Sequence, residues 1–232
     1  MPPGLDAYAT RLTLAGTYEN QMLYAMCRDA CRHDDAEHVR GKLIAIGRIY
    51  AASPERGAGK PRDETRDVFD VLADALCASD IDAKLDGIPA DWRYDHGTDM
   101  AAYVHDLHKH FVETLQSSIS EHCVAPKTGA GIKGRAYTSF ASKYLHFHRP
   151  NSIPILDSIA RHGLHAAGRA AGLVADRPGL KAPVTYRSYA RYCLFWDGFA
   201  KASADANWTQ RSIDTALLDL GRAELRRLAG VK

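Results

Sequence analysis

Residues 126–161 read PKTGAGIKGRAYTSFASKYLHFHRPNSIPILDSIAR. A glycine-rich basic turn comes first, then an amphipathic helix, a loop limited by two prolines, and an aspartate where the next helix should begin. That aspartate, Asp157, is the only carboxylate between Glu121 and Asp176. The cations that share the interval are Lys127, Lys133, Arg135, Lys143, Arg149, Arg161 and Arg169.

Asp157 admits two interpretations. It could be a helix N-cap only, because an aspartate side chain accepts hydrogen bonds from the free N–H groups of a first turn. It could also be a catalytic carboxylate that nearby cations keep ionised where a polyanionic substrate docks. The distribution of charge along the whole chain favours the catalytic interpretation.

The net charge of +2 hides a strong polarity along the 232 residues. Residues 1–126 hold 13 Lys/Arg against 21 Asp/Glu, whereas residues 127–232 hold 17 against 7. Such asymmetry predicts an electropositive face that meets a polyanion, and we expect double-stranded DNA as the partner. The alternative is that the two halves have solvated helices of different composition.

The cysteines and histidines do not form a convincing metal site. Cys27 and Cys31 stand at i,i+4, but no second ligand pair follows at short spacing, and His105, His108 and His110 resemble a metal cluster only superficially. The odd number of cysteines predicts reduced thiols in a cytoplasm. No apolar run approaches membrane-spanning length, so we expect a soluble, cytoplasmic monomer that does not bind membranes.

Helical periodicity dominates the chain and predicts an all-α fold. The crevice between two helical lobes should lie near residues 126–157, where the chemically capable side chains gather. The expected helices are 6–31, 35–52, 63–78, a short one after residue 80, 99–123, 135–148, 157–172, 184–203 and 209–228. The expected organisation is an acidic lobe (1–126), a hairpin-helix and catalytic segment (127–172), and C-terminal helices (173–232) that pack back on the acidic lobe.

The turn and the loop each have a physical use. Glycines let backbone N–H groups approach a phosphate closely, and a following helix N-terminus adds the positive end of its dipole. Lys133 and Arg135 add charge beside that point. Pro154 restricts Ile153 to extended conformations and so directs the chain toward Asp157.

In this order the segment resembles the helix-hairpin-helix–GPD DNA glycosylases. Residues 129–136 (GAGIKGRA) resemble the hairpin, and residues 150–157 (PNSIPILD) resemble the loop that delivers a catalytic aspartate in that superfamily. The resemblance implies a two-lobed helical fold, Asp157 as the catalytic aspartate, and no cofactor beyond a monovalent cation at the hairpin. The DNA-binding residues it implies are Gly129, Gly131, Lys133, Gly134 and Arg135.

The chain departs from the family at one catalytic position. Bifunctional members carry a nucleophilic lysine just after the hairpin, and the corresponding position here lies near Tyr137. Lys133 comes too early and Lys143 too late along its helix. We therefore predict a monofunctional enzyme, in which Lys143 is a phosphate contact or the partner of Asp157 and serves the site without acting as a nucleophile.

A second resemblance covers more of the chain. Residues 42–50, 139–148, 154–158 and 211–221 are similar to a group of mostly uncharacterised bacterial proteins, some of whose relatives look like glycosylases used against phages with modified DNA. This resemblance implies a single ancestry for the chain and a role in antiviral defence. It does not identify the base that is removed.

Three residues are candidates for a base pocket. Tyr50 could stack on an extruded base while Arg48 donates hydrogen bonds to it; packing at the end of a helix is the alternative. His148 could line the site from the helix that carries Lys143. His146 and His148 lie two residues apart and face opposite sides of that helix, and each could instead be a structural histidine.

The leading hypothesis is a DNA glycosylase that flips a damaged or modified base and hydrolyses its N-glycosidic bond. The alternative is a non-enzymatic nucleic-acid-binding helical module in which Asp157 is only a cap. A metal-dependent nuclease is disfavoured because the basic half has no second carboxylate near Asp157 in the sequence to share a divalent ion.

Overall fold

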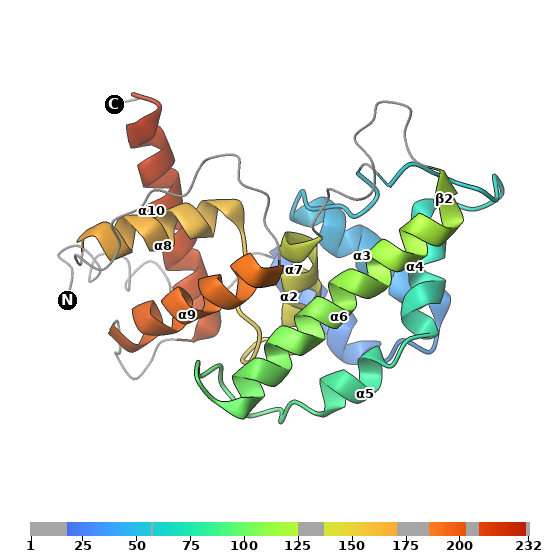
Figure 1. Ribbon diagram of the computed structural model, residues 1–232, viewed down its shortest axis with the longest axis horizontal. Coiled ribbons are helices and arrows are strands. Elements are labelled where there is room, and N and C mark those ends of the chain that lie inside the picture. Colours follow the sequence, from blue (N-terminus) through green and yellow to red (C-terminus); the bar gives the residue numbers. More distant parts are fainter. Residues whose placement is uncertain (1–17, 57, 125–136, 171–185, 203–208, 231–232) are drawn as a thin grey trace.

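The computed structural model describes residues 18–56, 58–124, 137–170, 186–202 and 209–230, and nearly all of the regular structure in these ranges is helical (Figure 1). The prediction of an all-α fold is therefore confirmed. The strands within these ranges are β1 (Lys60–Pro61) and β2 (Cys123–Val124), which form one short antiparallel pair.

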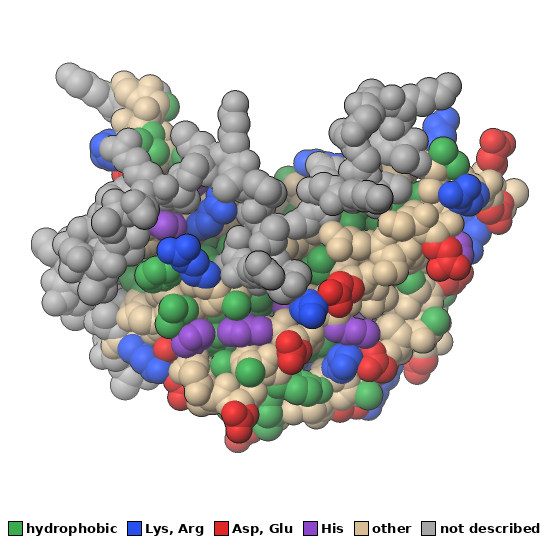
Figure 2. Space-filling view, viewed as in Figure 1, with side chains coloured by type: hydrophobic (Ala, Val, Ile, Leu, Met, Phe, Trp, Pro, Cys, Tyr) green, Lys and Arg blue, Asp and Glu red, His purple; other side chains and the backbone are tan. Residues whose placement is uncertain are grey.

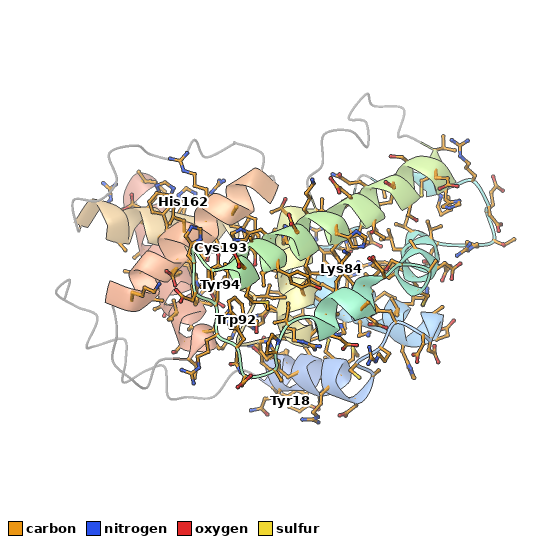
Figure 3. All side chains as sticks on the ribbon, turned by 60° about the horizontal axis from the view of Figure 1, so that its bottom comes forward. Tyr18, Lys84, Trp92, Tyr94, His162 and Cys193 are labelled. Carbon is orange, nitrogen blue, oxygen red and sulfur yellow. The ribbon has the colours of Figure 1, made fainter. Side chains whose placement is uncertain are left out.

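The helices gather in two groups (Figure 1). The first group holds α2 (Tyr18–Asp29), α3 (Ala36–Ile49), α4 (Val68–Cys77), α5 (Ile81–Asp86), α6 (Asp99–His122) and α7 (Thr138–His148). The second group holds α8 (Ser158–Ala170), α9 (Tyr186–Ala202) and α10 (Gln210–Leu228). Trp92 and Tyr94 lie at the junction, where the Tyr94 ring meets the Trp196 ring edge-on, with 6.0 Å between centroids (Figure 3).

Capping side chains set most of the helix starts. Asp35 accepts the N–H groups of the first turn of α3, and Thr98 does the same for α6. The helix predicted from residue 63 begins later, at α4, because Asp67 and Asp70 form a capping box there. Asp63 instead accepts from Thr65 in the preceding turn.

Helix α7 is the centre of the first group. Every residue of α7 except Ser139 is buried, and α7 packs against α2, α3 and α6. A charge at the centre of a helix buried on nearly all sides must be paired internally, because an unpaired buried charge is costly. This requirement applies above all to Lys143, in the middle of α7.

Helices α8 and α10 cross at two glycines. A β-carbon added to Gly163 would collide with the backbone carbonyl of Leu217, and one added to Gly221 would collide with that of Ile159. The two backbones therefore touch, and their contact is the most extensive between any two described elements. The crossing holds the start of α8, which follows Asp157 directly, against α10.

The expected segment 127–172 is divided between the two groups, because α7 packs with the first and α8 packs with α10. The predicted hairpin residues Gly129, Gly131, Lys133, Gly134 and Arg135 lie outside the described residues. None of the helices in the described ranges is both long enough and apolar enough to cross a lipid bilayer.

The glycine crossing generates a stability prediction. Gly163→Ala and Gly221→Ala should each destabilise the protein by about 1–3 kcal/mol or more, because the new methyl group meets backbone that cannot rotate away. Gly198→Ala in α9 is the matched control, since nothing lies within 4 Å of its added β-carbon and alanine favours helix. Chemical denaturation measures both effects. Equal stability of the three variants would contradict the close crossing.

Candidate functional site

The loop between α7 and α8 is fixed by side chains from two helices, α7 and α9. Ser142 Oγ of α7 accepts a hydrogen bond from the Leu156 N–H at 2.9 Å. His146 Nδ1 donates to the Ile153 carbonyl at 2.9 Å, and the Tyr189 hydroxyl of α9 donates to the Pro154 carbonyl at 3.0 Å. These three hydrogen bonds hold the backbone of residues 153, 154 and 156, and they thereby fix the position of Asp157.

Asp157 forms a salt bridge with Lys143. The Nζ of Lys143 lies 2.9 Å from Oδ2 of Asp157 and donates a second hydrogen bond to Ser139 Oγ at 2.8 Å. The other carboxylate oxygen of Asp157 accepts from the Ile159 N–H at 2.7 Å and so caps α8. Of the two roles expected for Lys143, the structure shows the one in which Lys143 pairs with Asp157. Asp157 therefore caps α8 and forms an ion pair at the same time.

The pair is largely removed from water, since the side chain of Lys143 is 2% exposed and that of Asp157 is 21% exposed. Burial alone would raise the pKa of Asp157. The charge and hydrogen bond of Lys143, together with the N–H groups of Ile159 and Ala160, outweigh burial and hold the pKa below its ordinary value. Asp157 is therefore an ionised carboxylate at neutral pH.

The pair lies in the wall of two cavities. The larger cavity has a volume of about 600 Å³ and the smaller about 240 Å³, and Tyr50, Lys143 and Asp157 line both. The remaining residues around the larger cavity are Glu19, Asn20, Ile49, Ala51, Ile155, Ile159, Ala160, Arg211, Asp214, Leu218 and Arg222. They come from α2, α3, α8 and α10 and from the loops, so the cavity lies between the two groups of helices.

Tyr50 connects the two sides of this cavity. Its hydroxyl donates to Asn20 Oδ1 at 2.5 Å, and Arg211 lines the same cavity. Its ring lies under Lys143, with Nζ 5.7 Å from the ring centroid. Burial raises the pKa of Tyr50 against the opposing charge of Arg211, so the phenol stays neutral.

Of the three residues predicted for a base pocket, only Tyr50 lines the larger cavity. Arg48 pairs with Glu55 at 2.7 Å and its side chain is 62% exposed. His148 stacks on His33 with 5.0 Å between ring centroids. Neither lines the cavity, and for His148 the reason is helical geometry, because five residues turn the helix by about 140° from the direction of Lys143.

His146 serves the structure. Its ring lies between the Ile153 carbonyl and the Tyr24 hydroxyl, which donates to Nε2 at 2.8 Å. Burial lowers the pKa of His146 to about 3, so the ring is neutral and joins α2 to the loop that ends at Asp157.

Sequence reasoning missed the contribution of α10. Arg211 and Asp214 stand three residues apart, so they share one face of α10, and both line the larger cavity. The expectation that Asp157 lacks a second carboxylate nearby is therefore wrong, because Asp214 reaches the same cavity from a distant part of the chain. Among the described residues, no three His, Cys, Asp or Glu side chains form a group suited to a metal ion.

No family model, curated protein or solved structure gives a significant match to this chain.

The buried pair predicts a strong energetic coupling. Lys143→Met should destabilise the protein by about 3–5 kcal/mol, because it leaves a largely buried carboxylate without its cation. Adding Asp157→Asn to Lys143→Met should recover much of that loss, so the double-mutant cycle is far from additive. Urea unfolding at neutral pH measures the cycle.

The exposed pair Lys109–Glu113 on α6, at 4.0 Å, is the control and should show no measurable coupling. The contribution of the buried pair should disappear as pH falls through the lowered pKa of Asp157, since the protonated acid no longer needs a cation. Additive losses for Lys143 and Asp157 would mean that the salt bridge contributes nothing.

Proposed function

We propose that this protein is a DNA glycosylase that hydrolyses the N-glycosidic bond of a flipped, damaged or modified base, with Asp157 as its catalytic carboxylate. The observation that carries the proposal is an ionised Asp157 carboxylate, held by the buried Lys143 at the wall of a cavity of about 600 Å³. A cavity of this size falls in the range of small-molecule sites and exceeds the needs of a bound ion.

The chemistry follows from the charge of Asp157. Loss of a base leaves positive charge on the sugar, and a fixed carboxylate in a site of low dielectric stabilises that charge strongly. The same carboxylate can orient or deprotonate the attacking water. Lys143 is the positioning residue, because it holds the carboxylate ionised and in one orientation.

The cavity would receive the extruded base. Enzymes that act on a base must take it out of the stack, and they read it in a pocket through its edge and its faces. Tyr50 supplies an aromatic ring in the wall, and Arg211 supplies hydrogen-bond donors. We propose that these two residues, together with the pair Lys143–Asp157, surround the base and its sugar.

Double-stranded DNA is the proposed partner, bound by a cytoplasmic monomer. Most acidic side chains on the face seen in Figure 2 lie over the first group of helices. The basic half of the sequence, residues 127–232, supplies both Asp157 and α10. Excision of modified bases from phage DNA, in defence, is the setting that the second resemblance implies.

We propose that the enzyme hydrolyses the glycosidic bond without cleaving the strand. Sequence reasoning placed Lys143 too far along its helix to reach the site, but its Nζ lies in the cavity wall next to Asp157. Attack on the sugar carbon requires a neutral amine. Lys143 instead donates to Ser139 and Asp157 as the cation of a salt bridge, so we infer that it supports Asp157 and does not attack.

A non-enzymatic nucleic-acid-binding module is the second candidate. The observation that favours it is the cap, because Asp157 Oδ1 accepts from the Ile159 N–H at 2.7 Å and would be retained for α8 alone. The two candidates predict different results for Asp157→Asn. An asparagine can still cap a helix, so the binding module keeps its function, whereas the glycosylase loses its catalytic carboxylate.

Asp157→Asn should reduce base release by on the order of a hundredfold or more, because the amide cannot stabilise a cationic sugar. The assay incubates each protein with natural, damaged and phage-modified DNA and scores released bases and abasic sites by mass spectrometry. Asp106→Asn, an exposed aspartate on α6, is the chemical control.

Because Asp157→Asn also leaves Lys143 unpaired, Leu115→Ala in the core of α6 serves as a control for lost stability, and all proteins are assayed below their unfolding transitions. Activity should survive in both controls. Base release by Asp157→Asn at the rate of the unmodified protein would make the carboxylate a cap only.

Borohydride treatment of the reacting protein should trap no covalent adduct, and strands should break only after hot alkali or an added endonuclease. The reason is that hydrogen bonds to Asp157 and Ser139 hold the amine of Lys143 away from attack on the sugar. Gel electrophoresis and intact-protein mass spectrometry read both outcomes. An adduct that is present in the unmodified protein and absent in Lys143→Met, with Lys109→Met retaining it, would assign a lyase mechanism to Lys143.

A further inference from the structure

Asp214 is a buried carboxylate that lacks a full set of partners. It is 2% exposed, and its Oδ1 accepts a hydrogen bond from Nε1 of Trp196 at 2.9 Å. Its Oδ2 is equally shielded from water and has no hydrogen-bond partner within the described part of the chain. A buried oxygen that lacks a partner is costly, so the protein either tolerates the cost or fills the position with a ligand.

The position of Asp214 in the cavity wall favours the second possibility, in which a ligand pairs with its carboxylate. Asp214 borders the same cavity as Asp157 but belongs to the α10 wall, and Arg211 lines that wall beside it. The Arg211 side chain and the Tyr50 hydroxyl line the same cavity, where burial raises the pKa of Tyr50 and Arg211 lowers it. Helix α10 therefore brings a carboxylate and a guanidinium to the same cavity wall, an acceptor beside a donor.

We propose that Asp214 and Arg211 read the hydrogen-bonding edge of a heterocyclic base, with a ring or exocyclic N–H of the base donating to Oδ2 of Asp214. Arg211 donates to the carbonyl oxygen or ring nitrogen beside that N–H. Both the lactam edge of uracil or guanine and the amidine edge of cytosine or adenine offer this pair. In placing a base in this cavity, the inference rests on the proposed glycosylase function.

A substrate class follows from this edge. The favoured substrates keep an unalkylated donor–acceptor edge and carry their modification elsewhere on the ring. Bases that are alkylated on that edge lose the N–H and place carbon against a buried carboxylate, which should exclude them by about 10⁴-fold or more. Asp214 is then a specificity residue, distinct from the pair that acts on the sugar.

Asp214 is also the group near this wall that titrates around neutrality. Burial raises its pKa to about 7, against the opposing effects of Trp196 and Arg211. The other groups that face it are Arg211 of α10, Tyr24 of α2, Tyr50 of α3, and Tyr192 and Cys193 of α9. Burial raises the pKa of the tyrosines and the cysteine, so they are neutral near pH 7.

The sign of the pH dependence is fixed by the direction of the hydrogen bond. An N–H of the base donates more strongly to the ionised carboxylate, and because Oδ1 accepts from Trp196, protonation would place the hydrogen on Oδ2. Binding should therefore strengthen as pH rises through about 7. A ligand that instead accepted a hydrogen bond from the protonated acid would bind better as pH falls. The slope therefore reports which edge Asp214 reads.

The experiment titrates the full-length protein with deoxyuridine and with deoxycytidine at pH 6, 7 and 8, following tryptophan fluorescence, because Trp196 contacts Asp214. Affinity should rise by about tenfold from pH 6 to pH 8. N3-methyldeoxyuridine and N4,N4-dimethyldeoxycytidine, which lack the donor, should not bind. Comparison of the two unmethylated nucleosides tells a lactam edge from an amidine edge.

Asp214→Asn should remove the pH slope, whereas Asp219→Asn, an aspartate farther along α10 that pairs with Arg222, should keep it. If Asp214→Asn does not fold, Arg211→Gln provides the second test. It should weaken binding of both nucleosides and move the midpoint to higher pH, because the carboxylate loses its cation. Arg226→Gln, exposed on α10, is its control.

Absence of nucleoside binding, a flat or reversed slope, or a slope retained in Asp214→Asn would overturn the inference. Nucleoside binding with the expected slope, but no base released from any DNA, would leave the recognition site standing and refute the glycosylase. Base release with no effect of Asp214→Asn on pH dependence or substrate choice would support the glycosylase and refute the role of Asp214.

Discussion

The salt bridge between Lys143 and Asp157 is the constraint on which the site depends. Helix α7 is buried on nearly all sides and carries a lysine at its centre, so the chain must supply an anion there. The basic stretch around it contains a single carboxylate, and the loop after α7 returns it to 2.9 Å from the ammonium. Burial that would otherwise penalise both charges thereby fixes an ionised carboxylate in one orientation.

The contact between α8 and α10 at Gly163 and Gly221 determines where α10 lies relative to the cavity. Contact between the two backbones at Gly163 and Gly221 is possible only without side chains, and it holds α10 against the start of α8. The face of α10 that bears Arg211 and Asp214 then lines the cavity that Asp157 also lines. One wall carries a salt bridge suited to a sugar, and the other carries an acceptor and a donor suited to a base.

The helices and the position of Asp157 at the start of α8 could be predicted because they depend on local patterns. Apolar spacing, capping residues and prolines act over a few residues, so most of the described helices fall close to their expected ranges. The late start of α4 shows the limit of such patterns, because a capping box at Asp67 and Asp70 overrides an earlier apparent start. The hairpin lies outside the described residues and stays a prediction.

The composition of the cavity could not be predicted, because it depends on contacts between residues far apart in the chain. Counting positions from a hairpin placed Lys143 out of reach, whereas the return of the loop decides its distance from Asp157. His148 was expected in the pocket, but its direction around α7 turns it toward His33. No local sequence pattern around Asp214 indicates that it lines the cavity, because only the contact between α8 and α10 brings it to the site.

A carbon-13 NMR titration of the aspartate carboxyl groups, with Asp157 assigned by its loss in Asp157→Asn, tests this account most directly. The account predicts that Asp157 stays ionised below the ordinary pH range of an aspartate and that Lys143→Met raises its pKa, because only the N–H groups of Ile159 and Ala160 then oppose burial. An Asp157 that titrates at the ordinary value in both proteins would contradict the buried salt bridge and the catalytic role proposed for it.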